Sequence, residues 1–375
     1  MKRIILLKSR IQANGGAEKY ARRLAVAFQE KNCDVALITS GPVPKESICE
    51  MISDETLSPF SFRRIQKFDR FCSKVLDVLE PDVIFSLDRN RRQTHIRASG
   101  GVHAAYLEHR RKESSFFKNL SFQINPLHRT LLNIEKSGFE DPSLKKLFVN
   151  SSMVRKEIIR FYNTDPNKIC VLHNGVEWEE MQQDFDLWED LKPQVAKKLQ
   201  LNPSTFHFLF IGHNYRRKGL EILLRALSKI AREDFHLSVV GKEKNLASFK
   251  ALVKALHLGN KVSFFPEQKE IRPFYQLADA LVIPSTYDPF ANVTVEALAM
   301  GVYTISSKTN GGKEVLTPDS GSIIEDLYEI DAVVNALKKA LSCPKTKNQA
   351  CSIRESVKHL DFGTQLMRYV DESLN

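Results

Sequence analysis

Two stretches of the sequence decide the fold: Phe208-Leu-Phe-Ile-Gly-His-Asn-Tyr-Arg-Arg-Lys-Gly219 and Leu281-Val-Ile-Pro-Ser-Thr-Tyr-Asp-Pro-Phe-Ala-Asn-Val-Thr-Val-Glu-Ala-Leu-Ala-Met-Gly301. Each opens with a short apolar run, continues through a loop and ends in a segment with helical periodicity. This order of strand, loop and helix is typical of a parallel sheet whose faces are covered by helices. The sequence therefore predicts an α/β fold around these stretches.

The same alternation extends over the rest of the chain. Short apolar runs predict strands near 4–7, 35–39, 83–86, 146–150, 208–211, 237–240, 262–265, 281–284 and 303–306. Amphipathic runs predict helices near 17–29, 62–79, 104–136, 151–161, 219–231, 246–256, 271–278 and 293–299. We expect two doubly wound, Rossmann-like domains that face each other across a cleft, because such sheets bind ligands beyond the carboxyl ends of their strands.

The expected domain boundary lies after residue 172. The stretch His173-Asn-Gly-Val176 is followed by a polar segment, as a connection between domains would be. We therefore expect an N-terminal domain over 1–172, an interdomain linker over 173–205 and a C-terminal domain over 206–354.

Composition excludes several classes of protein. The chain has 375 residues, of which 42% are hydrophobic and 27% charged, values that are ordinary for a globular protein and unlike a disordered, collagen-like or coiled-coil chain. The formal net charge is +10. Residues 1–172 contain 30 Lys and Arg against 19 Asp and Glu, so the first half carries all of the excess. An anionic partner is therefore expected to meet the first half.

The cysteines and the N-terminus give expectations about the compartment. The six cysteines form no Cys-x-x-Cys pair, which favours free thiols in a reducing cytosol over disulfides or structural zinc. The apolar run at residues 4–7 is too short for a signal peptide or a membrane-spanning helix. We expect the protein to stay in the compartment where it is made.

The loop and helix over 284–301 suggest a nucleotide site. A helix that begins near Asn292, Val293 and Thr294 presents free backbone N–H groups and a positive dipole end, which suit a diphosphate. Asp288 and Glu296 lie eight positions apart, and helix geometry keeps both at the opening of the predicted site, where their carboxylates can hold sugar or ribose hydroxyls. The alternative is a helix-capping Asp288 and a solvated Glu296.

The basic loop at 212–219 is the second candidate. It places Arg216, Arg217 and Lys218 after a predicted strand, with a glycine on either side. Cations at the carboxyl end of a strand suit a diphosphate leaving group. A solvated basic turn is the alternative.

Two further candidates lie in the first half. Gly15 and Gly16 follow the first predicted strand and allow close approach of a phosphate or sugar, although a glycine-rich turn is equally a structural need. His103 follows another glycine pair and can hydrogen-bond a sugar hydroxyl or accept a proton, although an incidental loop histidine fits as well.

The segment 106–135 mixes basic and aromatic residues. This mixture fits a segment that lies on an anionic membrane surface, and it also fits nucleic-acid binding or an ordinary amphipathic helix. The candidate contact residues are Arg110, Arg111, Lys112, Phe116, Phe117 and Lys118.

Taken together, these motifs resemble those of the family 4 retaining glycosyltransferases, which have the GT-B fold of two Rossmann-like domains. The likeness covers nearly the whole chain, is most specific over 208–301 and is strongest to the WaaG (RfaG) type of lipopolysaccharide core glucosyltransferase. Asn14-Gly-Gly-Ala-Glu-Lys-Tyr-Ala21 resembles the family's N-terminal glycine loop, and Gly212–Gly219 its Arg-Lys loop for the donor phosphates. Asp288 to Glu296 resembles the Glu-x7-Glu motif, with the shorter Asp in first place.

The resemblance implies roles for these residues. Arg217 and Lys218 would neutralise a departing diphosphate, Glu296 would bind the ribose, and Asp288 the donor sugar. Gly15, Gly16, Gly212 and the helix start at 292–294 would complete the donor site, and the acceptor would enter across Gly15-Gly16 and His103. His103 resembles the family's active-site histidine, although Gly100-Gly101 replaces an acidic residue expected nearby.

The resemblance also implies a substrate class and a location. It implies transfer of a hexose, favoured as glucose from UDP-glucose, to a lipopolysaccharide core or related glycolipid, without a metal or other cofactor. The enzyme would be cytoplasmic and peripheral on the inner membrane, with a C-terminal helix over about 355–375 that packs back on the first domain.

Three rival interpretations remain at this point. A UDP-sugar epimerase or hydrolase of GT-B fold would share the donor site. An NAD(P)-dependent oxidoreductase would share the strand–helix pattern, but no complete dinucleotide fingerprint is present. A nucleic-acid-binding protein would use the basic half and leave 208–301 without a purpose, so no nucleic acid is expected. The Asp-x-Asp at 184–186, a cue for metal sites, lies in the predicted linker and is not expected to bind metal.

Overall fold

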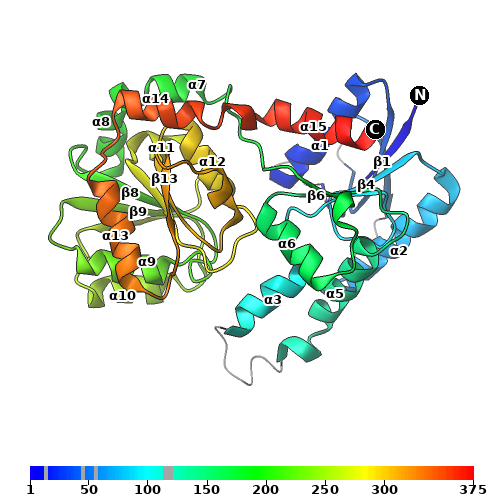
Figure 1. Ribbon diagram of the computed structural model, residues 1–375, viewed down its shortest axis with the longest axis horizontal. Helices are drawn as coiled ribbons and strands as arrows, with labels where there is room; N and C mark the ends of the chain where they lie inside the picture. Colours follow the sequence, from blue (N-terminus) through cyan, green and yellow to red (C-terminus); the bar gives the residue numbers. More distant parts are fainter. Residues whose placement is uncertain (12–15, 44–46, 55–57, 113–120) are drawn as a thin grey trace. The chain divides into compact units, whose positions relative to one another are not determined.

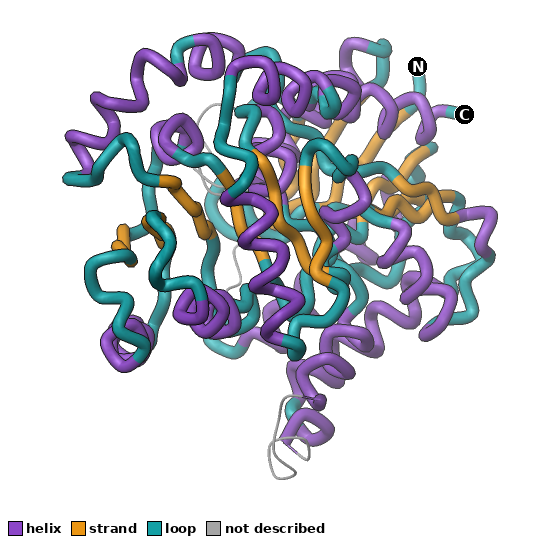
Figure 2. Tube along the Cα trace, turned by 60° about the vertical axis from the view of Figure 1, so that its left-hand side comes forward, coloured by secondary structure: helices purple, strands orange, loops and turns teal. Residues whose placement is uncertain are grey.

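The computed structural model describes residues 1–375 except 12–15, 44–46, 55–57 and 113–120. The chain divides into two compact units. The first unit comprises Met1–His173 and Gln365–Asn375, and the second comprises Asn174–Thr364. Each unit is a parallel sheet with helices packed on it (Figure 1, Figure 2).

The first unit contains a parallel sheet with the strand order β3-β2-β1-β4-β5-β6-β7. Its strands are β1 (Arg3–Leu7), β2 (Asp34–Ser40), β3 (Glu50–Asp54), β4 (Val83–Ser86), β5 (His95–Arg97), β6 (Lys146–Val149) and β7 (Ile169–Val171). Its helices are α1 (Gly16–Glu30), α2 (Ser61–Leu79), α3 (His103–Lys112), α5 (Pro126–Phe139), α6 (Ser152–Phe161), the short 3-10 helix at Pro166–Lys168 and most of α15 (Phe362–Leu374). The chain continues from β1 first to one side of that strand and later to the other, so the topology switches between β1 and β4.

The second unit repeats the plan with the strand order β10-β9-β8-β11-β12-β13. Its strands are β8 (Phe206–Ile211), β9 (Phe235–Val240), β10 (Val262–Phe265), β11 (Ala280–Ile283), β12 (Tyr303–Ser307) and β13 (Gly321–Ile324). Its helices are α7 (Gln182–Asp186), α8 (Trp188–Leu199), α9 (Leu220–Lys229), α10 (Leu246–Ala255), α11 (Arg272–Leu277), α12 (Asn292–Ala299), α13 (Ile330–Leu341) and α14 (Lys347–Glu355), with 3-10 turns at Gly311–Val315 and Lys358–Leu360. Here the switch lies between β8 and β11.

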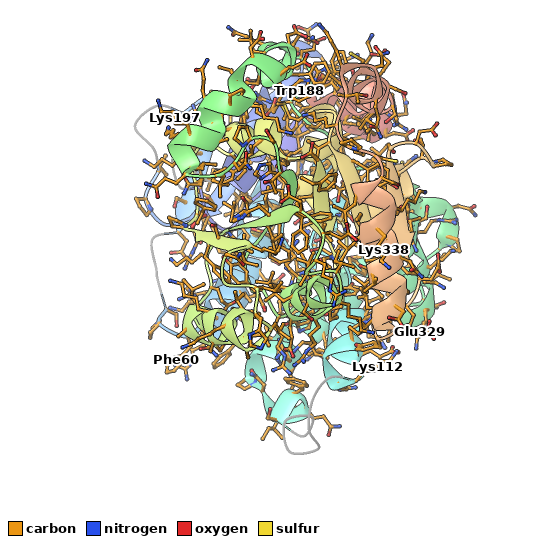
Figure 3. All side chains as sticks on the ribbon, turned by 90° about the vertical axis from the view of Figure 1, so that its left-hand side faces the viewer. Phe60, Lys112, Trp188, Lys197, Glu329 and Lys338 are labelled. Carbon is orange, nitrogen blue, oxygen red and sulfur yellow. The ribbon has the colours of Figure 1, made fainter. Side chains whose placement is uncertain are left out.

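Helix α13 illustrates why these segments fold as they do. Val333, Val334 and Leu337 recur at helical spacing and are buried against the sheet. Lys338 is exposed on the opposite side of the same helix (Figure 3). The apolar stripe therefore decides which face of the helix meets the core.

The α/β prediction with two Rossmann-like units is confirmed, and several of its details are corrected. The segment 173–205, expected to be a linker, is folded and belongs almost entirely to the second unit, where α7 and α8 pack against α11. The single helix expected over 104–136 is divided: among the described residues, α3 ends at Lys112, residues 121–124 are helical, and α5 begins separately at Pro126. Strands β3, β5, β7 and β13 were not predicted, since each is short or carries polar residues.

The C-terminal segment expected over 355–375 is also divided. Helix α14 ends at Glu355, and α15 joins the first unit from Gln365 onward (Figure 1). Tyr369 packs edge-on against Phe148, with ring centroids 5.0 Å apart, and Lys146 pairs with Glu372 at 2.7 Å. Among the described residues, no helix combines the length and the apolar character that crossing a membrane requires.

Candidate functional site

The switch point of the second sheet brings together the two stretches that the sequence singled out. Strands β8 and β11 are neighbours, and their carboxyl ends lead into the loops 212–219 and 284–291. The backbone N–H of Thr286 donates to the carbonyl of Arg217 at 2.9 Å, so the loops are joined directly. Ligands of doubly wound sheets bind at such a switch point.

Arg217 and Lys218 converge on Asp288 across this junction. Nζ of Lys218 lies 2.6 Å from Oδ2 of Asp288, and a guanidinium nitrogen of Arg217 lies 3.0 Å from the same oxygen. The same guanidinium donates to the carbonyl of Tyr287 at 2.9 Å. Two cations therefore meet one carboxylate, which leaves a net positive charge at the strand ends.

The charge state of Asp288 follows from these contacts. Its side chain is only 8% exposed, and burial by itself would raise its pKa. Lys218 and Arg217, by charge and by hydrogen bonding, outweigh burial and hold the pKa of Asp288 below its ordinary value. The helix-cap alternative is wrong: Oδ1 of Asp288 accepts from the N–H of Phe290 at 3.2 Å, in the loop before α12, and the N-cap of α12 is Ala291, with no capping side chain.

Gly219 is required for the close fit of the two loops. Its φ angle is +81°, and a Cβ at this position would lie 1.9 Å from the carbonyl oxygen of Pro284. Any side chain would thus push the basic loop away from the end of β11. Gly212 has more space, because a Cβ there would meet only the flexible side chain of Lys218, at 3.1 Å.

Glu296 lies on α12 and is held by a residue that the sequence analysis missed. The hydroxyl of Tyr275, on α11, donates to Oε2 of Glu296 at 2.8 Å. Burial raises the pKa of Glu296, while Tyr275 and the charge of Lys218 oppose that shift. Glu296 is therefore an oriented, largely buried carboxylate and not the solvated helix residue of the alternative interpretation.

The start of α12 offers further polar groups. Asn292 is exposed, and its Oδ1 accepts from Nδ2 of Asn174 at 2.7 Å. Val293 is half-buried. Oγ1 of Thr294 is buried and has no hydrogen-bond partner among the described residues. A bound ligand can supply that missing partner.

A second loop that the sequence analysis missed braces Asp288. The backbone N–H of Asp288 donates to the carbonyl of Thr309, and the N–H of Gly311 donates to the carbonyl of Asp288. Oδ1 of Asn310 accepts from the N–H groups of Ala291 and Gly312. The tripeptide Asn310-Gly-Gly repeats Asn14-Gly-Gly, and this repeat in the sequence could have pointed to the loop.

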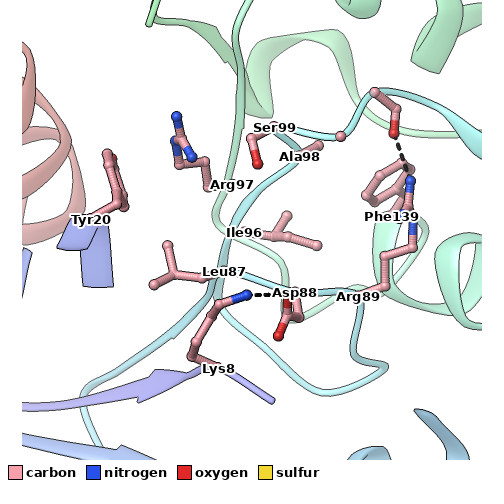
Figure 4. A pocket seen from close by; sticks show the side chains of 12 residues that line it. Lys8, Tyr20, Leu87, Asp88, Arg89, Ile96, Arg97, Ala98, Ser99 and Phe139 are labelled. Carbon is pink, nitrogen blue, oxygen red and sulfur yellow. Dashed lines mark hydrogen bonds and ion pairs between the residues drawn. The ribbon is translucent and has the colours of Figure 1, made fainter. Parts of the chain in front are cut away.

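The first unit has a pocket at its own switch point. The pocket has a volume of about 200 Å³ and lies where β1, β4 and β5 end (Figure 4). Lys8 and Asp88 form an ion pair at 2.9 Å within it, and Arg97 lies 4.0 Å over the ring of Tyr20. Gly100-Gly101 lines the same pocket. None of the charged lining residues was predicted, although each lies at or within three residues of the end of a strand.

His103 is placed by a buried network beside this pocket. Its backbone N–H donates to Oε1 of Glu135 at 2.8 Å, and Glu135 also binds Arg89 and the hydroxyl of Tyr162, both at 2.6 Å. The His103 ring faces His128, with Nε2 and Nδ1 3.1 Å apart. Burial, together with the charges of Arg89 and His128, lowers the pKa of His103 to about 3. The imidazole is therefore neutral at physiological pH.

The remaining predicted residues are only partly described. Gly15, Phe116, Phe117 and Lys118 lie outside the described residues, and Gly16 is the first residue of α1. Arg110, Arg111 and Lys112 form the last turn of α3. Arg111 and Lys112 are exposed, and Arg110 is half-buried, with its guanidinium 3.0 Å from the hydroxyl of Tyr106.

Metal-ligating residues do not gather in the described ranges. No group of three or more His, Cys, Asp or Glu side chains suited to a metal ion occurs there. Asp184, from the Asp-x-Asp sequence, instead pairs with Arg272 at 2.8 Å on the second unit.

Comparison with known proteins agrees with this geometry. The family model described as Glycosyltransferase Family 4 matches residues 14–180, and the one described as Glycosyl transferases group 1 matches residues 192–355. The two matches together cover most of the chain; the first spans most of the first unit and extends to residue 180, and the second lies within the second unit.

The sequence relatives match only part of this chain. The glycosyltransferase MJ1607 of Methanocaldococcus jannaschii is 30% identical over 199 residues, which are 51% of this chain and 50% of that protein. A D-inositol 3-phosphate glycosyltransferase of a Mycobacterium species is 28% identical over 224 residues, 57% of this chain and 48% of that protein. The matches thus span about half the length of these relatives.

Solved structures share the fold over the whole chain. The glycosyltransferase WaaG, described as involved in lipopolysaccharide biosynthesis, superposes with a TM-score of 0.77 at 19% identity, over 99% of both chains. HepE of Anabaena, solved in complex with UDP and glucose, superposes with a TM-score of 0.68 at 15% identity, over 100% of this chain and 99% of its own. At these identities the likeness establishes the architecture.

Proposed function

Because the chain belongs to the family 4 glycosyltransferases of GT-B fold, we propose that it transfers a hexose from a nucleoside-diphosphate sugar to a glycolipid acceptor, with retention of the anomeric configuration. The observation that carries the proposal is the convergence of Arg217 and Lys218 on Asp288 at the switch point of the second sheet. There the second unit binds the donor, and the first unit binds the acceptor.

The basic loop supplies the charge that the leaving group needs. A departing nucleoside diphosphate gains negative charge as the bond to the sugar breaks, and fixed cations stabilise that charge in the transition state. Arg217 and Lys218 take this role, together with the N–H groups at the start of α12. We propose that no metal ion is required, since these groups can neutralise the diphosphate.

The carboxylates hold the hydroxyl groups of the donor. Glu296 accepts hydrogen bonds from the ribose, and Asp288, kept ionised by its two cations, accepts them from the donor sugar. We propose UDP-glucose as the donor, which HepE supports because it was solved with UDP and glucose. Gly212, Asn292, Val293 and Thr294 complete the donor site.

The acceptor binds in the first unit. The pocket beside Gly100-Gly101 offers the carboxylate of Asp88 and the hydroxyl of Ser99 to sugar hydroxyls. His103 acts as a neutral hydrogen-bonding group, because its lowered pKa excludes a standing positive charge. We propose a lipopolysaccharide core or a related glycolipid as acceptor, supported by the architecture shared with WaaG, and Gly15 and Gly16 as part of its binding loop.

Nucleotide binding tests the donor site. We expect calorimetry to detect UDP in preference to GDP, ADP and NAD. Replacement of Glu296 by Ala is expected to weaken UDP binding about 10- to 100-fold, because a hydrogen bond to a charged group contributes roughly 1.5–3 kcal/mol. UDP binding is also expected to weaken as the pH falls toward the raised pKa of Glu296, since the protonated carboxyl is the poorer acceptor.

The control for this measurement is Glu329→Ala, which removes an exposed carboxylate at the start of α13 (Figure 3). Equal UDP affinity of both variants and the wild type would contradict the assignment of Glu296. Turnover of UDP-glucose without any acceptor, to free glucose or to another UDP-sugar, would instead indicate a hydrolase or an epimerase.

The basic end of α3 leads to a second prediction, that the chain binds the cytoplasmic face of the inner membrane. The triple variant Arg110→Gln, Arg111→Gln and Lys112→Gln is expected to bind phosphatidylglycerol vesicles roughly 100-fold more weakly, because each basic residue near an anionic surface contributes about 1 kcal/mol. Co-sedimentation with vesicles measures this change.

A matched triple variant controls for net charge. Lys197, Lys198 and Lys254 are exposed lysines of the second unit, and their replacement by Gln removes the same charge. If both triple variants lose binding equally, or if the wild type does not bind anionic vesicles, the membrane role of α3 is wrong.

A further inference from the structure

We infer that the first unit contains a second ligand site, an anion subsite lined by Arg10, Arg64 and Lys67, which binds a phosphate or carboxylate substituent on the acceptor sugar. This inference rests on the proposed function and names the class of acceptor: a glycan that carries an anionic group next to the sugar that is glycosylated. The sequence alone did not bring these cations together: Arg10 lies four residues before the Asn14 motif, and Arg64 and Lys67 lie in a predicted helix.

The subsite is a pocket at the carboxyl edge of the first sheet. It has a volume of about 210 Å³. Ser9 follows β1, Ser40 ends β2 and Asp54 ends β3, and all three line the pocket. The first turns of α2 form the rest of the wall. Its position beyond the strand ends is where ligands of such sheets bind.

The charge of the lining favours an anion. Arg10, Arg64 and Lys67 face one carboxylate, that of Asp54. The guanidinium of Arg64 donates to the carbonyl of Ser58 at 3.2 Å and to the hydroxyl of Ser61 at 3.1 Å, both neutral partners. Neither Arg10 nor Lys67 forms an ion pair within the described part of the chain. Arg64 is thus held in place while its charge stays uncompensated, as a preorganised anion site requires.

The neighbouring pocket around Asp88 differs in this respect. There, Lys8 is neutralised by Asp88 at 2.9 Å, and Arg89 by the fully buried Glu135 at 2.6 Å. The third cation of this pocket, Arg97, lies over the rings of Tyr20 and Tyr369. A pocket in which most cations are paired with carboxylates suits the hydroxyl groups of a neutral sugar. We therefore assign the sugar part of the acceptor to the pocket around Asp88 and its anionic part to the anion subsite.

Ser9 connects the two pockets. It lines the anion subsite, and both its backbone N–H and its hydroxyl donate to Oδ2 of Asp88 at 2.7 Å. Lys8, next in the chain, lines the other pocket, so neighbouring residues line the two pockets. In the inferred arrangement one acceptor molecule occupies both.

The test uses the full chain saturated with UDP, so that the donor site is filled. Glucose 6-phosphate and glucose are the probes, and calorimetry measures their affinities. We expect the wild type to prefer glucose 6-phosphate. The double variant Arg10→Gln, Lys67→Gln is expected to bind it about tenfold or more weakly, because charge-assisted contacts to phosphate are lost. Arg64→Gln is expected to act in the same direction.

Arg70→Gln is the matched control, because Arg70 is exposed on the same helix and does not line the pocket. Glucose 6-phosphate affinity that is equal in the wild type and the double variant would overturn the inference, as would the absence of any preference for the phosphorylated sugar. The inference would also be overturned if the double variant lost binding to phosphatidylglycerol vesicles but kept its affinity for glucose 6-phosphate, since the cations would then bind lipid headgroups. Failure of UDP to bind would reject the donor site alone, because the same titration without UDP still measures the anion subsite.

Discussion

Replacement of Lys218 by Gln is expected to lower kcat for sugar transfer about 10²- to 10³-fold, the usual loss when one preorganised group that stabilises developing charge is removed. The Lys218 side chain is only 11% exposed and lies 2.6 Å from Asp288. Little water is therefore available to take its place beside the diphosphate. Gln keeps most of the packing volume and removes the charge.

The same change is expected to shift the pH dependence of the reaction. Lys218 is the larger of the two charges that hold the pKa of Asp288 low, and burial opposes them. Without Lys218 the pKa of Asp288 rises, so the carboxylate protonates at a higher pH. As the pH falls, the variant should lose its residual activity earlier than the wild type does.

Arg216→Gln is the control for Lys218→Gln, because Arg216 is the exposed neighbour in the same loop. Initial rates with UDP-glucose and a glycolipid acceptor, followed across pH, measure both effects. Wild-type kcat in Lys218→Gln would show that the loop does not contact the leaving group.

Replacement of Arg354 by Met is expected to destabilise the second unit by about 3 kcal/mol, since buried hydrogen bonds from a charged donor contribute roughly 1.5–3 kcal/mol each and Met recovers part of the loss by apolar burial. Arg354 is 3% exposed. Its guanidinium donates to the carbonyls of Ala299 and Trp178 and to the side chain of Gln182, and it lies 4.1 Å over the Trp178 ring.

These contacts explain why the segment after residue 173 is folded. Arg354, next to the end of α14, fixes the start of this segment through Trp178, whose indole N–H donates back to the carbonyl of Arg354 at 3.0 Å. Urea unfolding of the variant measures the loss of stability. Arg232→Met, at an exposed arginine of the same unit, is the control, and equal midpoints for the two variants would contradict this account.

The sequence by itself determined the features that depend on local pattern. Apolar runs placed most strands, because strands of a parallel sheet covered by helices are buried on both faces and are apolar throughout. The helical period placed most helices. The spacing of Asp288 and Glu296 and the position of Arg217 after a strand could also be predicted, because both are local features of the sequence. Strands such as β5, His95–Arg97, escaped prediction because neighbouring strands and not composition define them.

Only the tertiary structure decided which of these features meet. The pairing of Arg217 with Asp288, the bond from Tyr275 to Glu296 and the network around Glu135 join residues that are distant in sequence. The two pockets of the first unit likewise depend on the strand order. Strand order and side-chain partners arise from packing and hydrogen bonding between remote segments, and local sequence periodicity carries no information about which remote segment is the partner.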